Sequence, residues 1–274
     1  SGGGGADPVM TTDGDLVYYN SGRKRLPIGI EGSTLDIISG LPFWSSPYIT
    51  ATGGSVDAGT IDGDYKYHIF STVGTATFTG HTVTVQSYSI TVGDGGAAQG
   101  TGLTVGNNGS NSIFSTITSL GGGAGGKGTN GAGSSGGSGG GSGSGNSAVS
   151  GGSSSVNGNN GGAGTNASKS GGGGGSGSVG QDGSSAASGT GGFGGSGTSS
   201  SITGSAVLRS GGGGGGAYST GGAGGSGGGG SGGGGAVGNN ATANTGSGGG
   251  GASRTFTPSG AGGSGIVILR YKFQ

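Results

Sequence analysis

The sequence has no cysteine, only five prolines and few charges, and each shortage excludes a class of protein. Without cysteine there can be no disulfide and no thiolate zinc site. Five prolines and the lack of a strict Gly-X-Y period exclude collagen. Only 7% of the residues are charged, and ten basic side chains balance ten acidic ones. We therefore expect no nucleic-acid partner and no attraction to an anionic membrane surface.

Apolar residues are also scarce. They make up 27% of the 274 residues, too few to build a conventional core along the whole chain. No apolar stretch approaches the roughly 20 residues that span a bilayer, so we expect no membrane insertion. Only part of the chain can be a globular domain with an apolar core.

Glycine is in excess, with 86 residues, and it dominates an almost unbroken Gly/Ser run from Gly121 to Gly265. Composition alone would make this run a flexible linker. The run lies between two β-type segments, Ile113–Leu120 and Ile266–Phe273, which would close its base if they lie near each other. We therefore predict that the run is ordered.

Order in such a run has to come from the backbone. Fixing each residue costs about 1–2 kcal/mol, glycine costs the most, and there are few side chains to offset it. Polyglycine II helices have three residues per turn and direct every N–H and C=O sideways, so neighbouring helices can hydrogen-bond to one another. We predict a bundle of such helices over 121–260, with turns at the polar interruptions 156–160, 166–169, 180–183 and 238–240.

Residues 47–120 predict a small antiparallel β-sandwich, which residues 261–274 would complete with a closing strand. Tyr65, Tyr67 and Ile69 would share one strand face, and Lys66, His68 and Phe70 the other. Further strands are predicted at 76–79, 81–85, 88–92 and 113–117, and in the first block, 1–46, at 16–19 and 35–38. The predicted fold class is mostly β with little or no α-helix: a sandwich that carries the glycine-rich bundle as an insertion.

The residues that could carry chemistry favour structural roles. His68 and His81 have no carboxylate or cysteine companion at ligand spacing, so we expect neither to bind a metal or act in catalysis. The stretch 121–128 superficially resembles a phosphate-binding loop through Lys127, but Gly128 stands where a Ser or Thr would bind magnesium.

The charged residues and the glycosylation sequons also favour structural roles. The acidic groups are Asp7, Asp13 and Asp15, and Asp57, Asp62 and Asp64. Asp62-Gly-Asp64 could bind calcium or form a turn, and the turn is favoured because Asp-Gly is more often a turn sequence. The Arg23–Arg25 cluster indicates a solvated face or a subunit contact, and the sequons at Asn108, Asn166 and Asn240 are expected by chance. We predict a non-enzyme with no catalytic, cofactor-binding or metal site and no cofactor.

Two stretches resemble bacteriophage proteins. The order T-T-x-G-D-L-V-Y-Y-N, R-L-P-I-G and S-G-L-P-x-W within residues 9–44 resembles a short repeat of tail fibres and related fibrous proteins of tailed bacteriophages. The motifs I-T-A-T-G-G, G-D-Y-K-Y-H-I-F, Y-S-I-T-V-G-D-G-G, G-S-N-S-I-F-S-T-I-T-S-L-G-G-G and G-G-S-G-I-V-I-L-R-Y, spread over 49–273, are similar to the glycine-rich domain of phage structural proteins.

This resemblance implies a non-enzymatic structural protein on the virion surface, in a tail fibre, a head fibre or a capsid decoration. Block 1–46 would attach or trimerise it, and the bundle's turn loops would contact a host receptor or glycan. The expected partners are two further copies in a homotrimer and other virion proteins, because Tyr18, Tyr19, Phe43 and Trp44 need covering. Two alternatives remain: a secreted or cell-surface filament or matrix subunit, and an ice- or glycan-binding bundle, for which regular threonine rows are not apparent.

Overall fold

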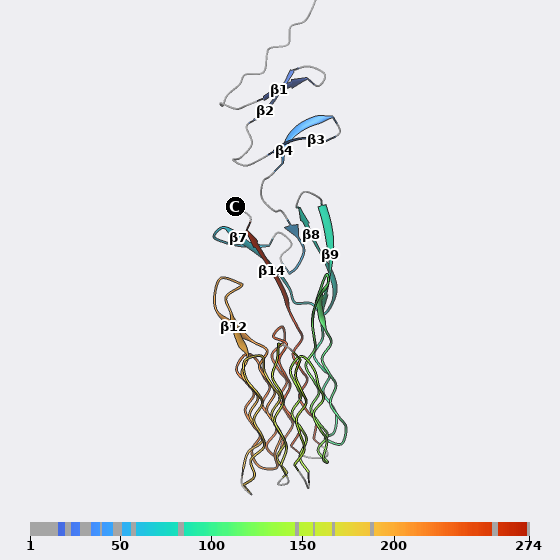
Figure 1. Cartoon of the computed structure of the whole chain (residues 1–274), viewed down its shortest axis with the longest axis vertical. Helices are drawn as coiled ribbons and strands as arrows, with labels where there is room; N and C mark the ends of the chain where they lie inside the picture. Colours follow the sequence, from blue (N-terminus) through green and yellow to red (C-terminus); the bar gives the residue numbers. More distant parts are fainter. Residues whose placement is uncertain are drawn as a thin grey trace, which may run out of the picture.

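The computed structural model describes residues 16–19, 23–27, 34–38, 40–45, 51–55, 59–81, 85–145, 148–155, 157–165, 168–186, 189–253 and 257–272. These residues contain no helix, and their strands form antiparallel sheets, which confirms the predicted mostly β fold. The molecule is elongated: small hairpins lie at one end, a sandwich follows, and a bundle of long parallel traces forms the other end (Figure 1).

Two hairpins precede the sandwich. The first pairs β1 (Leu16–Tyr19) with β2 (Arg23–Leu26), and the second pairs β3 (Thr34–Ile38) with β4 (Leu41–Ser45). The indole N–H of Trp44 donates to the Pro27 carbonyl at 2.6 Å and so links the two hairpins. An isolated two-stranded hairpin is marginally stable in water, so this block depends on further contacts.

Two sheets form the sandwich. The larger has the order β11-β10-β9-β8-β5 and the smaller β14-β7-β6. The strands are β5 (Ala51–Thr52), β6 (Thr60–Asp62), β7 (Tyr65–Phe70), β8 (Gly74–His81), β9 (Val85–Val92), β10 (Ser112–Phe114), β11 (Ile117–Ser119) and β14 (Val267–Lys272). Phe70, Ile90 and Val92 form the buried core, so the inner face of β7 is the one that carries His68 and Phe70.

The two β-type segments that bound the glycine run meet inside this sandwich. Phe114 of β10 and Val267 of β14 both pack on the core formed by Phe70, Ile90 and Val92, each from its own sheet. The base of the insertion is therefore closed across a hydrophobic core, and not by direct pairing of β10 with β14. β14 pairs instead with β7 along its whole length.

Two predicted strands differ from the structure. The alternation over 113–117 predicts one strand, but the chain turns there, because Ser115 has a positive φ of 52° and β10 pairs back with β11. The stretch 81–85 also predicts one strand, yet His81 ends β8 and pairs with Val85, the first residue of β9. Residues 82–84 lie outside the described part of the chain.

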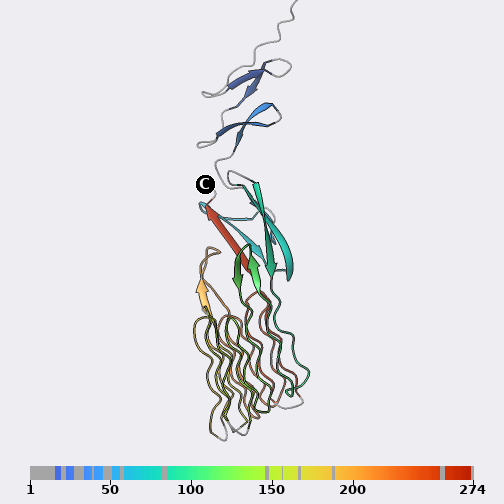
Figure 2. The ribbon, with the colours of Figure 1, turned by 45° about the vertical axis from the view of Figure 1, so that its right-hand side comes forward.

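Between the sandwich strands the chain runs up and down in extended segments (Figures 1 and 2). Their approximate ranges are 93–99, 105–111, 120–127, 131–136, 138–144, 149–155, 159–165, 169–176, 178–184, 190–197, 210–217, 221–226, 229–234, 238–242, 246–253 and 257–265. One short hairpin, β12 (Thr198–Ser200) with β13 (Val207–Arg209), interrupts them. The bundle thus includes residues 93–111, which the sequence pattern grouped with the sandwich.

The hydrogen bonds between segments repeat every three residues. The N–H of Gly123 donates to the carbonyl of Ser138, and the N–H of Gly126 donates to that of Gly141, so both partners advance by three. A period of three is that of a polyglycine II helix, whereas a β-strand has a period of two and an α-helix 3.6. The segments therefore have the polyglycine II repeat predicted from the glycine excess.

Each inner segment bonds to several neighbours at once. Residues 138–144 bond to residues of the segments 120–127, 131–136, 149–155, 159–165 and 169–176. Such contact on many sides requires close approach: a Cβ on Gly140 would overlap the carbonyl of Ala124, and one on Gly152 would overlap that of Ser134. Glycine is needed here because a methyl group would force the segments apart.

Acidic and amide side chains complete the bonding where a segment lacks a backbone partner. Asp182 Oδ1 accepts the Ala163 N–H at 2.7 Å, and Asn240 Oδ1 accepts the Ala261 N–H at 2.8 Å. The predicted turns at 180–183 and 238–240 are therefore wrong, since both stretches lie within extended segments. A turn is present at 157–158, and another lies between Thr165 and Lys169, although residues 166 and 167 are outside the described part.

Candidate functional site

The histidine that the sequence singled out belongs to the sandwich core. His68 is 1% exposed, and its Nδ1 lies 2.7 Å from the Gly53 carbonyl, which can only accept, so Nδ1 carries the proton. Nε2 then accepts from the Tyr271 hydroxyl at 3.1 Å, and the two rings stack. These contacts occupy both ring nitrogens, as expected of a structural histidine. His81 ends β8, and its side chain lies outside the described part.

The acidic positions are separated in the structure. Asp62 forms an ion pair with Arg270 at 3.0 Å, while Asp64 is exposed at the turn between β6 and β7. Asp7, Asp13, Asp15 and Asp57 lie outside the described residues. Within the described ranges, no three His, Cys, Asp or Glu side chains come close enough together to hold a metal ion.

The remaining sequence candidates lie in structural positions. Residues 121–127 lie in an extended segment and Gly128 begins a turn, with no helix after it, so a phosphate would find no helix N-terminus there. Arg23–Arg25 form most of β2. Asn108 and Asn240 each accept a backbone N–H of a neighbouring segment through Oδ1, and Asn166 lies outside the described part.

An arginine joins the bundle to the sandwich. Besides its ion pair with Asp62, Arg270 of β14 donates to the carbonyls of Ser201 and Ile202 at 3.3 Å, in the loop between β12 and β13. Its guanidinium lies 4.5 Å from the centre of the Tyr65 ring. Sequence patterns did not indicate this contact, because its partners are backbone carbonyls 68 and 69 residues away.

The loops farthest from the sandwich gather at one end of the bundle, which we call the loop end (Figures 1 and 2). Its described turns include 100–104, 128–130, 218–220 and 235–237. The exposed apolar side chains here are Leu103 (44%), Val105 (45%), Tyr218 (64%) and Val237 (52%). Neighbouring loops are tied together, since the N–H of Gly128 donates to the carbonyl of Gly102 at 2.7 Å. The loop end therefore combines a fixed backbone with exposed apolar contacts.

A buried lysine supports another loop at this end. Lys169 is only 3% exposed, and its ammonium donates to the carbonyl of Ala186 at 2.6 Å. Burial of a charge is costly unless it is hydrogen-bonded, so this contact holds the loop that begins after Ser184. Nothing in the local sequence around Lys169 distinguishes it from an exposed lysine.

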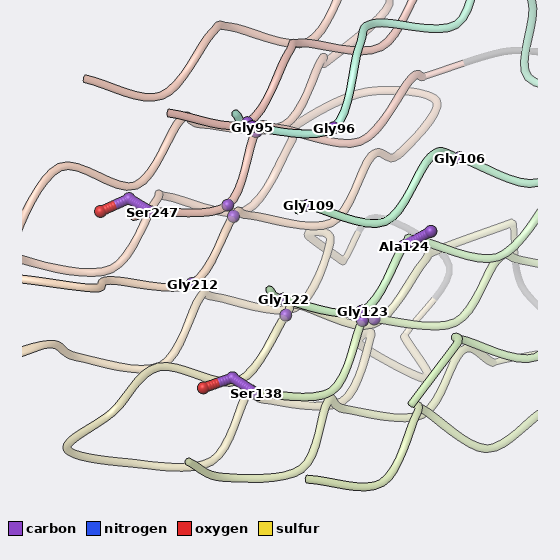
Figure 3. A pocket seen from close by; sticks show the side chains of 18 of the residues that line it. Gly95, Gly96, Gly106, Gly109, Gly122, Gly123, Ala124, Ser138, Gly212 and Ser247 are labelled. Atoms are coloured by element: carbon purple, nitrogen blue, oxygen red, sulfur yellow. The ribbon is translucent and has the colours of Figure 1, made fainter. Parts of the chain in front are cut away.

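A cavity of about 810 Å³ runs along the bundle and is partly open to solvent, since Gly122 and Gly125 of its wall are exposed. Glycine backbone forms much of its wall, with small side chains such as Ala124, Ser138 and Ser247 between the glycines (Figure 3). Larger side chains, including those of Asp94, Arg209 and Tyr218, also line it. The wall offers peptide N–H and C=O groups together with serine and threonine hydroxyls, so it can form many hydrogen bonds.

The described residues include no helix that is both long enough and apolar enough to cross a membrane. Among known protein families, a family model described as a glycine-rich domain matches residues 68–272. Searches of curated proteins and of solved structures each returned no significant match.

Proposed function

This chain belongs to the glycine-rich domain family, whose model covers well over half of its length, and on that premise we propose a non-enzymatic structural role on the virion of a tailed bacteriophage. In this role the chain is part of a tail fibre, a head fibre or a capsid decoration. Its loop end contacts a receptor or glycan on the host surface. The resemblance of residues 9–44 to fibre repeats supports the assignment to a phage.

The observation that carries the proposal is the position of the loop end. The hairpins of the first block and the loop end lie at opposite ends of an elongated molecule (Figure 1). One end can therefore attach to a virion while the other reaches outward. Exposed Leu103, Tyr218 and Val237 supply apolar contact area on loops, and binding residues commonly lie on loops held by a rigid scaffold.

Binding of the labelled full-length chain to a panel of bacterial cells and to a glycan array tests the proposal. We expect saturable binding to a subset of these surfaces. The double variant Tyr218→Ala/Val237→Ser should weaken binding by roughly tenfold or more, the effect of losing about 1.4 kcal/mol of contact energy. Val179→Ser is the matched control, because Val179 is 59% exposed but lies within a segment, away from the loop end. Binding that both variants weaken equally, or no binding at all, contradicts the proposal.

The attachment end supports a homotrimer as part of the same proposal. Leu35, Ile37 and Leu41 of the second hairpin are 45%, 64% and 40% exposed, on an element too small to be stable alone. Copies of this hairpin, or another virion protein, would cover these side chains. Light scattering of the full chain should give the mass of a trimer, and Ile37→Ser should shift it toward the monomer. A folded monomer at all concentrations contradicts the trimer.

A further inference from the structure

A complete ring of hydrogen-bonded segments surrounds the cavity, which stays partly open to solvent. In order around the ring these are 93–99, 105–111, 120–127, 138–144, 169–176, 210–217, 246–253 and 257–265, and backbone hydrogen bonds join each to the next, the last to the first. Most of the residues that line the cavity come from these segments, their turns and the adjoining sandwich ends; Ser155 and Asn157 come from outside the ring. The ring closes where the N–H of Gly262 donates to the carbonyl of Gly96 at 2.9 Å.

Some N–H groups of the ring point into this cavity. In a trans peptide the C=O of one residue and the N–H of the next point in opposite directions. The carbonyl of Gly212 accepts the N–H of Gly225, which is outside the ring, so the N–H of Gly213 faces inward. By the same argument the carbonyl of Gly140 bonds outward to Gly152, and the N–H of Gly141 faces the cavity.

Carbonyl groups point inward from the segment between these two. The N–H groups of Gly172 and Gly175 donate outward to Gln181 and Ser178, so the carbonyls of Gly171 and Gly174 face the cavity. Among the described residues, none of these inward groups, including the N–H groups of Gly141 and Gly213, has a hydrogen-bond partner. Gly141, Gly171, Gly174 and Gly213 are nevertheless buried.

Buried peptide groups in proteins are nearly always paired, and each one left without a partner costs about 1–3 kcal/mol. The wall offers both donors and acceptors, so a neutral molecule that donates and accepts would satisfy both. At about 30 Å³ per molecule, the cavity has room for on the order of 20 water molecules. We propose that the cavity is a specific hydration site, in which a row of ordered water molecules bridges the inward N–H groups of Gly141 and Gly213 to the inward carbonyls of Gly171 and Gly174.

This water is part of the folded structure and takes the place of additional polyglycine helices inside the ring. The inward groups recur at intervals of three residues, as in the carbonyls of Gly171 and Gly174. The waters therefore follow the helical repeat of the wall, about 9.3 Å along the axis. The competing possibility is a dry cavity. A side chain that fills the space should change the melting temperature in opposite directions in the hydrated and the dry cavity.

Substitution of Gly173 distinguishes a hydrated cavity from a dry one. A Cβ placed on Gly173 would lie 3.4 Å from the Gly213 nitrogen and 3.8 Å from the Gly139 carbonyl oxygen, ordinary contact distances, on the cavity wall. Gly173→Leu should displace water and leave inward N–H groups without partners, so the melting temperature should fall. In a dry cavity the same side chain would fill a void and raise the melting temperature, which would overturn the proposal.

Two companion variants isolate the effect of the displaced water. Gly100→Leu, at an exposed position with nothing within 4 Å of the added Cβ, controls for the replacement of glycine by leucine. Gly173→Asn should recover part of the loss, because its amide both donates and accepts. The proposal is contradicted if Gly173→Leu has a melting temperature as high as that of Gly100→Leu. It is also contradicted if Gly173→Asn melts no higher than Gly173→Leu.

Water relaxation dispersion of the full chain then tests the waters directly. The wild type and Gly100→Leu should show the same dispersion amplitude from long-lived internal water. Gly173→Asn should show a smaller amplitude, and this variant should fold even if Gly173→Leu does not. Absence of a long-lived component in the wild type, or an amplitude unchanged by Gly173→Asn, would refute the hydration site.

Discussion

Replacing one interior glycine with alanine should open the lattice locally, and Gly140→Ala is the sharpest case. An added methyl would overlap the carbonyl of Ala124, which already accepts the Ser134 N–H at 2.8 Å. Because backbone cannot rotate away as a flexible side chain can, the segments 120–127, 131–136 and 138–144 have to separate. The bonds that join them here are Ser134 N–Ala124 O, Gly140 N–Ser134 O, Gly123 N–Ser138 O and Gly126 N–Gly141 O.

The magnitude follows from these four bonds. At about 0.5–1.5 kcal/mol net for each, their loss costs about 2–6 kcal/mol. Alanine restricts the unfolded chain and so offsets about 0.4–1 kcal/mol, which leaves a net loss of local stability of about 1–6 kcal/mol. Since about 1.4 kcal/mol is a factor of ten, amide exchange in 131–144 should accelerate between several-fold and about ten-thousand-fold.

Hydrogen exchange followed by mass spectrometry measures this directly, and Gly122→Ala is the matched control. Gly122 lies in a neighbouring segment and is exposed, and the nearest atom to its added Cβ is the Ser138 carbonyl oxygen at 4.0 Å. We expect unchanged or slightly slower exchange in this control. Equal exchange in the two variants would show that close backbone approach does not hold the bundle together.

Three further substitutions test other contacts. Ser142→Gly removes a buried hydroxyl that has no hydrogen-bond partner among the described residues, so the melting temperature should stay the same or rise; a clear fall would contradict this assignment. Arg270→Ala removes the ion pair with Asp62 and the hydrogen bonds to the β12–β13 loop. It should lower the free energy of unfolding by about 1–3 kcal/mol and speed amide exchange in the β12–β13 hairpin. Unchanged amide exchange would show that Arg270 does not hold this hairpin. Asp182→Ala should cost about 0.5–1.5 kcal/mol in denaturant unfolding because the Ala163 N–H loses its acceptor at an exposed site. Asp182→Asn keeps an acceptor and should cost less, and equal losses would argue against this role.

The fold class could be predicted because glycine excess leaves few physical solutions. With collagen excluded and too few apolar residues for a core, backbone bonding between polyglycine helices remained, and the three-residue repeat fits it. The alternation in β7 likewise predicted the faces of Lys66, His68 and Phe70, of which the last two are buried.

The limits of the bundle could not be predicted from composition. Residues 93–111 follow the predicted strand 88–92 and were therefore grouped with the sandwich, yet most of this stretch is extended and bonded into the ring. At Asp182 and Asn240 the sequence predicted turns in place of extended segments. An Asx side chain can bond to local backbone in a turn or to a neighbouring segment, and only the tertiary arrangement decides between them.

The cavity and the loop end were also beyond sequence reasoning. Which N–H groups face inward depends on which segments become neighbours, and a run of near-identical Gly/Ser segments carries little information on that order. The exposure of Tyr218 and Val237 at one end follows from where each segment turns. Their apolar character alone did not distinguish them from Phe193 on a bundle segment.

The orientation of the bonds between segments has a mechanical consequence. If a host surface holds the loop end while the virion holds the opposite end, tension runs along the segments. The bonds between segments lie across that direction, so the load reaches many of them together in shear and does not peel them apart singly. A bundle built mainly from glycine can therefore resist pulling along its axis while any one of its bonds is weak.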